Sequence, residues 1–241
     1  MSAWFISDLH LDPACPAGLD ALRHCLDAIA GDGGPLHILG DLFEMWIGDD
    51  DDDPFTDACC AVLAAFARQQ PLLALHGNRD FLADAGFCAR TGATLLPEPS
   101  VILLPSGRPA LVMHGDSLCT DDAEYQHVRK QLRSAGWQRD VLARPLAERR
   151  ALGAAMRAQS RAANANRAAA ITDVNEAEVT RVAAEHGVDL VIHGHTHRPA
   201  THRRHAGTPV TRIVLGDWTP DGMVLRAADH GRFELRRSDT L

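Results

Sequence analysis

Five short motifs place aspartate, asparagine and histidine side chains directly after apolar segments of the chain. They are Asp8-Leu9-His10, Gly40-Asp41, Gly77-Asn78-Arg79-Asp80, His114-Gly115-Asp116 and Gly194-His195-Thr196-His197. Oxygen and imidazole ligands without a thiolate suit Mn, Fe, Zn or Co better than a soft metal. Seven ligands are too many for one tetrahedral ion, but they fit two ions about 3.5–4 Å apart that share a carboxylate. The candidate metal ligands are Asp8, His10, Asp41, Asn78, His114, His195 and His197.

Each motif taken alone is a weak signal, because an Asp-x-His segment after a strand more often caps a turn than binds a metal. His76 and His193 illustrate that alternative: both lie beside the motifs, and we expect both to be packed or hydrogen-bonded side chains. The five motifs together, each after an apolar strand, are far more specific. They predict a two-metal site.

The apolar pattern predicts a scaffold that brings these distant segments together. Alternating strands and helices indicate an α/β fold with a largely parallel sheet. In such sheets ligand groups converge beyond the carboxyl ends of the strands, where the motifs lie. We expect strands at 4–7, 36–39, 72–75, 101–104, 110–113, 188–192, 213–215, 223–225 and 233–235, and helices at 19–29 and 58–68.

The length of 241 residues and the hydrophobic content of 46% fit one domain, 1–241, with a mostly helical insertion at about 122–170. The N-terminal residues lack the basic and apolar regions of a secretory signal, and no apolar run reaches the roughly 18 residues of a membrane span. The six cysteines show no CxxC spacing, and we interpret them as reduced thiols. These features predict a cytoplasmic protein and leave peripheral membrane attachment open.

The formal net charge of −8 is unevenly distributed. Residues 125–170 carry ten basic and two acidic residues, net +8, which leaves −16 on the remaining chain. The acidic total argues against a general nucleic-acid-binding surface, so we expect no nucleic-acid partner. The five aspartates 49–53 are expected to form a solvated loop that ends at Pro54.

From Asp8 to His197, the order of the motifs resembles the calcineurin-like metallophosphoesterase superfamily. The resemblance implies an αββα sandwich, in which two sheets are flanked by helices. It also implies how the ligands divide between two metals. One metal would be held by Asp8, His10 and His197, the other by Asn78, His114 and His195, with Asp41 as the bridge.

The third motif departs from the usual superfamily pattern, because Arg79 stands where a histidine commonly follows the asparagine. That histidine can help to protonate the alkoxide leaving group of a diester. A diphosphate does not need this proton, because its leaving group is a phosphate with a second pKa of about 6. Arg79 can instead hold a phosphate oxygen through two hydrogen bonds. The alternative is a surface arginine in a turn.

Longer strings resemble a narrower family, the UDP-2,3-diacylglucosamine diphosphatases of lipid A biosynthesis. The strings lie at 39–44, 46–50, 76–82, 114–122, 157–160, 173–175 and 193–199. This resemblance implies a two-metal diphosphate hydrolase in which metal-activated water attacks the alpha phosphorus, giving UMP and 2,3-diacylglucosamine 1-phosphate. It implies two Mn²⁺ per chain, although other divalent ions stay possible. It also implies peripheral attachment to the cytoplasmic face of the inner membrane. No obligate protein partner is evident from the sequence.

The same resemblance implies which residues contact the substrate. Position 167, usually lysine in the family, is Arg167 here, which keeps the charge but replaces an ammonium with a planar fork. Ser160, Asn164 and Arg167 share one face of a helix by their spacing, for which a solvated face is the alternative. The implied substrate contacts are Asn78, Arg79, Asp122, Ser160, Asn164, Arg167 and His195. The implied catalytic residues are Asp41, Asn78, Arg79 and His195.

The basic insertion interleaves arginines with apolar residues, which allows two interpretations. A basic amphipathic helix can lie on anionic lipid, or a helical cap can pack on the domain with its arginines outward. We hypothesise a lid whose apolar side shelters acyl chains. Its basic side, including Arg149 and Arg150, would face headgroups or the diphosphate.

Two other functions stay open at this point. A metallophosphoesterase acting on nucleotides, cyclic diesters or phosphoproteins would use the same ligands but would not need the apolar and basic lid. A non-catalytic scaffold with this fold typically lacks one or more ligands, whereas all seven are present in this sequence.

Overall fold

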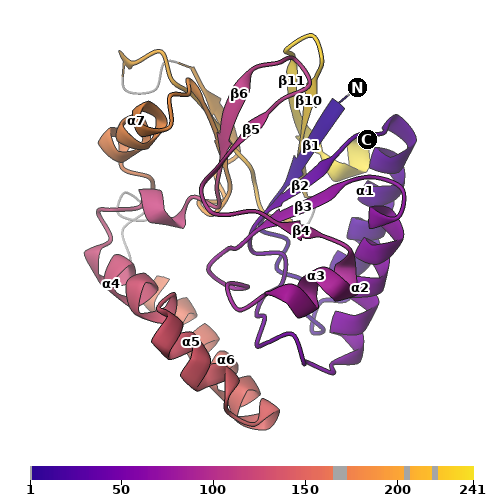
Figure 1. The fold of residues 1–241 in the computed structure, drawn as a ribbon, viewed down its shortest axis with the longest axis vertical. Helices are drawn as coiled ribbons and strands as arrows, with labels where there is room; N and C mark the ends of the chain where they lie inside the picture. Colours follow the sequence, from indigo (N-terminus) through magenta and orange to yellow (C-terminus); the bar gives the residue numbers. More distant parts are fainter. Residues whose placement is uncertain (1, 165–172, 204–206, 219–221) are drawn as a thin grey trace.

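The computed structural model describes residues 2–164, 173–203, 207–218 and 222–241 (Figure 1). In this part of the chain two β-sheets lie face to face. Helices α1 (Ala17–Asp32), α2 (Pro54–Ala67) and α3 (Ala85–Thr91) pack against the outer face of the first sheet. Helix α7 (Glu176–Glu185) packs against the outer face of the second. This order of layers confirms the expected α/β fold and its αββα sandwich.

The first sheet has a parallel centre. Its strands are β1 (Ser2–Ile6), β2 (Leu36–Leu39), β3 (Leu72–Leu75), β4 (Thr94–Leu95), β10 (Met223–Ala228) and β11 (Phe233–Arg237), in the order β11-β10-β1-β2-β3-β4. Strands β1 to β4 run parallel, and β10 pairs antiparallel with both β1 and β11. The carboxyl ends of β1, β2 and β3 therefore lie at one edge.

Strand β1 shows how the sequence buries both faces of this sheet. Ala3 and Phe5 belong to the apolar core between the two sheets, whereas Trp4 and Ile6 belong to the core under helices α1 to α3. This alternation follows from the two-residue period of a strand. A strand covered on both sides must be apolar throughout, as parallel sheets of α/β proteins are.

The second sheet has the order β5-β6-β7-β9-β8. Its strands are β5 (Ser100–Leu103), β6 (Pro109–Val112), β7 (Leu190–His193), β8 (Ala200–His202) and β9 (Thr211–Val214). Strands β5 and β6 form the expected antiparallel hairpin, and β6, β7 and β9 run parallel. Short 3₁₀ turns follow β6 at Asp116–Leu118 and β11 at Ser238–Thr240.

Residues 123–164, which we call the helical insert, extend from one end of the sandwich (Figure 1). They form α4 (Ala123–Leu132), α5 (Ala135–Leu142) and α6 (Leu146–Asn164). The predicted helical character is confirmed as far as Asn164, and the remainder of the expected insertion, 165–170, lies outside the described residues. None of the helices in the described ranges is both long and apolar enough to span a membrane.

The prediction that aspartates 49–53 form a solvated loop is confirmed in part: they lie in a loop that ends at Pro54, and Asp50 and Asp52 are exposed, but each aspartate also has a partner. Asp49 accepts hydrogen bonds from the Trp46 indole and from the backbone of Gly86. The other aspartates contact the helical insert or a helix end: Asp50 pairs with Arg149, Asp51 and Asp52 pair with Arg150, and Asp53 caps α2. Three aspartates of the acidic run therefore pair with the basic insert.

Arg149 and Arg150 were expected to face lipid headgroups or the diphosphate, but both pair with the acidic loop; Arg149 is buried, whereas Arg150 stays exposed. Arg149 is 3% exposed and also donates to the carbonyl of Ile47 at 2.8 Å. The Asp53 cap, followed by Pro54, starts α2 four residues before the predicted Ala58, since proline is favoured in the first helical turn. All six cysteines are free thiols, as expected.

Burial of His37 between the sheets predicts a pH-dependent stability. The ring stacks on Phe5 with centroids 4.7 Å apart, and burial lowers the pKa of His37 to about 4 although the Trp4 carbonyl opposes the shift. A lowered pKa in the folded state means that stability is full above about pH 6.5 and is lost as the pH falls toward 4. The contribution amounts to about 2 kcal/mol between pH 7 and pH 5.

We expect His37→Phe to lose less stability over this interval than the wild type, measured by urea denaturation with a chelator present. His24→Gln, at an exposed position of α1, is the control and should retain the wild-type dependence. An unchanged pH dependence in His37→Phe would contradict the prediction.

Candidate metal centre

The structure brings all seven candidate metal ligands to the edge where the two sheets meet. In the first sheet, Asp8 and His10 follow β1, Asp41 follows β2, and Asn78 follows β3. In the second sheet, His114 follows β6, and both His195 and His197 follow β7. The site is thus assembled from loops at the carboxyl ends of parallel strands, as the sequence pattern predicted.

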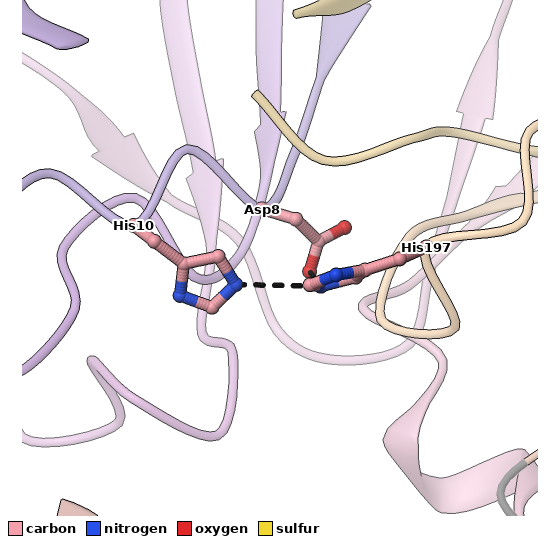
Figure 2. Close-up of side chains that lie close together, drawn as sticks. All are labelled: Asp8, His10 and His197. Atoms are coloured by element: carbon pink, nitrogen blue, oxygen red, sulfur yellow. Dashed lines mark hydrogen bonds and ion pairs between the residues drawn. The ribbon is translucent and has the colours of Figure 1, made fainter. Parts of the chain in front are cut away.

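A first group of ligand atoms comes from Asp8, His10 and His197 (Figure 2). The Nε2 atoms of the two histidines are 3.3 Å apart, and Oδ1 of Asp8 lies 3.5 Å from Nε2 of His197. Oδ2 of Asp41 lies 3.9 Å from Nε2 of His10. One ligand atom from each of Asp8, His10 and His197 lies within 4.8 Å of the other two, which is close enough for all three to hold one cation.

A second group lies beside the first. Oδ1 of Asn78 is 2.9 Å from Nε2 of His114 and 2.9 Å from Nδ1 of His195. Oδ1 of Asp41 lies 3.7 Å from Nε2 of His114. The two carboxylate oxygens of Asp41 therefore face different groups, which is the geometry of a bridging ligand.

The backbone at this edge is held in a rare conformation. Asp8, His10, Asp41, His195 and His197 all have positive φ, between 49° and 65°. Non-glycine residues seldom adopt this region, and at functional sites they do so where the surrounding structure imposes it. Gly194 shows how tight the packing is, since an added Cβ would overlap the side chains of Ser7 and Asp8.

The residues present fit a pair of divalent cations. Oδ1 of Asp8 is buried and has no hydrogen-bond partner among the described residues, which is costly for a carboxylate unless a cation faces it. The outward nitrogens of two histidines are occupied: Nδ1 of His10 lies 2.9 Å from Glu44, and Nδ1 of His114 lies 2.9 Å from the Leu39 carbonyl. Such partners fix the ring so that the other nitrogen can ligate a metal.

The pKa values of these side chains are set by burial on one side and by neighbouring charges on the other. Burial lowers the pKa of His114, but the surrounding carboxylates, above all Asp41 and Asp8, outweigh burial and raise it to about 9. Burial raises the pKa of Asp8, while its contact with His197 and the charge of His114 outweigh burial and hold that pKa below its usual range. Burial and the neighbouring His114 lower the pKa of His195 to about 3. Protons and cations would therefore compete for these groups.

The expected substrate contacts differ in how near they lie to the metal centre. Arg79 donates its backbone N–H to Oδ1 of Asp41 at 2.8 Å, and its guanidinium reaches Ser160 of α6 at 3.5 Å. Asp122 caps α4 by accepting from the backbone of Tyr125, a structural role that the sequence did not suggest. Asn164 is the last residue of α6, and Arg167 lies outside the described residues.

Sequence reasoning missed the residues that support the ligands. Glu44 and Asp217 lie beside the outward nitrogens of His10 and His197. No motif marks Asp217, although Glu44 lies within one of the strings that resemble the narrower family. The expectation for the neighbouring histidines is confirmed, because His76 bonds to the Ala83 carbonyl and His193 is buried against Arg212.

The chain is similar to known phosphoesterases over most of its length. The family model of the calcineurin-like phosphoesterases matches residues 1–199. A protein from Cellvibrio japonicus named UDP-2,3-diacylglucosamine hydrolase is 49% identical over 233 residues, which cover 96% of this chain and 97% of that protein. A protein of the same name from Stenotrophomonas maltophilia is 46% identical, and the match covers 100% of this chain and 99% of that protein. A solved dimetal phosphatase from Danio rerio, 12% identical, has a similar fold with a TM-score of 0.56 over 99% of this chain and 96% of that one.

Metal loading should stabilise the protein through Asp41. A cation that binds only the folded chain adds about 2.7 kcal/mol at a concentration one hundred times its Kd. We expect Mn²⁺ to raise the Tm of chelator-treated protein, and Asp41→Asn, which keeps the shape but removes the charge, to lose most of that rise. Asp27→Asn on an exposed position of α1 is the control, measured alongside by scanning calorimetry. A rise of Tm in Asp41→Asn equal to that of the wild type would show that Asp41 does not bind the metal.

Proposed function

The chain belongs to the calcineurin-like phosphoesterase family, and we propose that it hydrolyses the diphosphate of UDP-2,3-diacylglucosamine to UMP and 2,3-diacylglucosamine 1-phosphate. Relatives named UDP-2,3-diacylglucosamine hydrolase match 96% of the chain at 45–49% identity, including those from Cellvibrio and Xanthomonas. The reaction belongs to lipid A biosynthesis. The supporting arguments come from Arg79, from the ligand geometry and from the helical insert.

The position of Arg79 carries the proposal. Its backbone is tied to Asp41 in the metal centre, and its Nε is buried without a hydrogen-bond partner among the described residues. A guanidinium whose buried Nε is an unused donor suits a phosphate oxygen, with which arginine forms paired hydrogen bonds. An arginine is a poor general acid, because its side chain stays protonated at any ordinary pH, so the site suits a substrate whose leaving group is already a phosphate.

Two bound divalent cations, Mn²⁺ in this proposal, would lower the pKa of a water near the alpha phosphorus and neutralise charge on the phosphate oxygens. Asp8, His10 and His197 would hold one cation, Asn78, His114 and His195 the other, and Asp41 both. Arg79, Asn78 and His195 would hold the diphosphate and stabilise the negative charge that develops on it. The same donors select an anionic, phosphate-bearing substrate.

The helical insert supplies surfaces for the lipid part. Apolar side chains line a pocket between the insert and the sandwich, among them Met45, Ile47, Phe81, Trp137 and Met156. This pocket holds only about 20 Å³, so it marks an apolar contact and not the space for the acyl chains. We propose that the single domain 1–241 uses its insertion at 122–170 as a lid that shelters the acyl chains. Asp122, Ser160, Asn164 and Arg167 are proposed to contact the substrate from the lid.

Attachment to the cytoplasmic face of the inner membrane is part of the same proposal. The exposed residues of the insert include the cations Lys130 and Arg139 and the apolar side chains Val128 and Leu142, 42% and 41% exposed. Basic residues beside apolar ones suit an anionic lipid surface, to which each cation contributes about 1 kcal/mol. Arg149 is anchored to Asp50 instead and is not part of this surface.

One assay separates the possible activities. Purified protein with Mn²⁺ should release UMP from UDP-2,3-diacylglucosamine, and Asp8→Ala should abolish release. Arg79→Ala should lower kcat about 100-fold, as loss of one donor to a developing charge does, while Mn²⁺ affinity is kept. Arg68→Ala, at an exposed position at the end of α2, is the control and should release UMP as the wild type does.

Hydrolysis of simple diesters in place of the diphosphate would identify a different phosphoesterase. Intact Mn²⁺ binding without any hydrolysis would indicate a scaffold, and both outcomes contradict the proposal.

Membrane attachment is tested with sedimentation of anionic phosphatidylglycerol vesicles at low salt. The double variant Lys130→Glu with Arg139→Glu should bind at least about tenfold more weakly, given the contribution of each cation. The double variant Arg181→Glu with Arg232→Glu reverses two exposed charges outside the insert and should bind as the wild type does. Equal binding of both double variants would exclude the insert as the lipid-facing surface.

A further inference from the structure

Arg157 of helix α6 contacts a carboxylate that in turn contacts a candidate metal ligand. Its Nε donates to Oε1 of Glu44 at 3.0 Å. The other oxygen of Glu44, Oε2, lies 2.9 Å from Nδ1 of His10. Figure 2 shows that the opposite ring nitrogen of His10 points toward His197, within the metal centre. The contacts therefore lead from the helical insert to His10 through one carboxylate.

A second bridge of the same kind starts at the end of α4. Arg133 donates to Oε2 of Glu98 at 3.2 Å and to the carbonyl of Gly77 at 3.0 Å, next to Asn78. Oε1 of Glu98 accepts the backbone N–H of His114 at 2.9 Å. Arg133 thus reaches the loops of two ligands of the second group, one of them through a carboxylate.

These carboxylates are shielded from water and depend on their cationic partners. The side chains of Glu98 and Glu44 are 6% and 16% exposed. Removal of an arginine would leave a largely buried negative charge without one of its cationic partners, so the carboxylate would move. That movement would alter the group that orients a metal ligand. Substitution of such outer partners typically costs about 10- to 100-fold in metal affinity.

We propose that Glu44 and Glu98 are positioning residues that couple the seating of the helical insert to the geometry of the metal centre. A seated insert holds both carboxylates where they orient the ligands, and the metal then binds more tightly. Coupling between two equilibria is reciprocal, so bound metal must favour the seated insert by the same factor. The inference rests on the metal centre proposed above but not on which phosphate compound is hydrolysed.

The first experiment measures Mn²⁺ affinity by titration calorimetry, without substrate. Glu44→Gln keeps the size of the side chain and removes its charge, and we expect it to weaken binding about tenfold or more. Arg157→Ala and Arg133→Ala should each weaken binding at least threefold, and Arg157→Lys should restore part of the loss. Arg161→Ala, one turn further along α6, and Arg144→Ala, before α6, remove exposed arginines and serve as matched controls.

The second experiment measures the reciprocal effect by hydrogen exchange of the α6 amides. Mn²⁺ should slow exchange in α6 of the wild type and of Arg161→Ala, and should slow it much less in Glu44→Gln. A purely structural ion pair gives a different result: the variants would exchange faster, but Mn²⁺ would protect α6 to the same extent as in the wild type.

Mn²⁺ affinities of the bridge variants within twofold of their controls would overturn the proposal, as would equal protection of α6 in Glu44→Gln and the wild type. Circular dichroism of each metal-free variant checks that it is folded, and Glu44→Gln supplies the decisive comparison if an arginine variant is not. Since neither readout involves substrate, failure of the proposed hydrolysis would leave both results interpretable.

Discussion

The carboxylate of Asp41 is the constraint on which the rest of the structure depends. One of its oxygens faces His10 from the first sheet, and the other faces His114 from the second. A carboxylate that is only 3% exposed can stay charged only if cationic groups and N–H donors surround it. Those partners come from both sheets, so the sheets must meet at this edge with the loops after β2, β3 and β6 in contact. The neighbouring Asp80 strengthens this arrangement by accepting from the backbone of Leu42 and Gly77, one from each of two ligand loops.

The uneven charge along the sequence is partly neutralised within the molecule. The acidic loop that contains Asp50 meets the basic insert at Arg149 and Arg150, and Asp12 and Glu44 meet it at Arg157. On the second bridge, Glu98 and Asp116 meet Arg129 and Arg133. A stretch of net positive charge can therefore dock onto an acidic domain without a nucleic acid or a membrane to neutralise it. Only the cations that remain exposed are available for a lipid surface.

Much of the fold and of the candidate site could be predicted, because both follow from local patterns. The strand before each ligand is apolar on both faces, as β1 shows, and the ligand then comes at a fixed place after the strand. The partners of Asp50 and Arg149 could not be predicted, because they are 99 residues apart and nothing local to either residue indicates the other. The capping role of Asp122 was missed for a different reason: a carboxylate before a helix and a carboxylate in a binding site have the same local sequence.

Five of the candidate ligands have positive φ, and the contacts that impose this backbone conformation link the insert to the metal centre. A left-handed conformation at Asp8 or His197 is unfavourable in isolation and persists only where surrounding contacts impose it. Some of those contacts come from the sheets, but the contact behind His10 comes from Glu44, whose charge is balanced by an arginine of α6. The conformation of the ligand loops is therefore supported in part by the insert. A protein built in this way would hold its candidate metal ligands most rigidly when the insert is in place, which is also when a substrate would be enclosed.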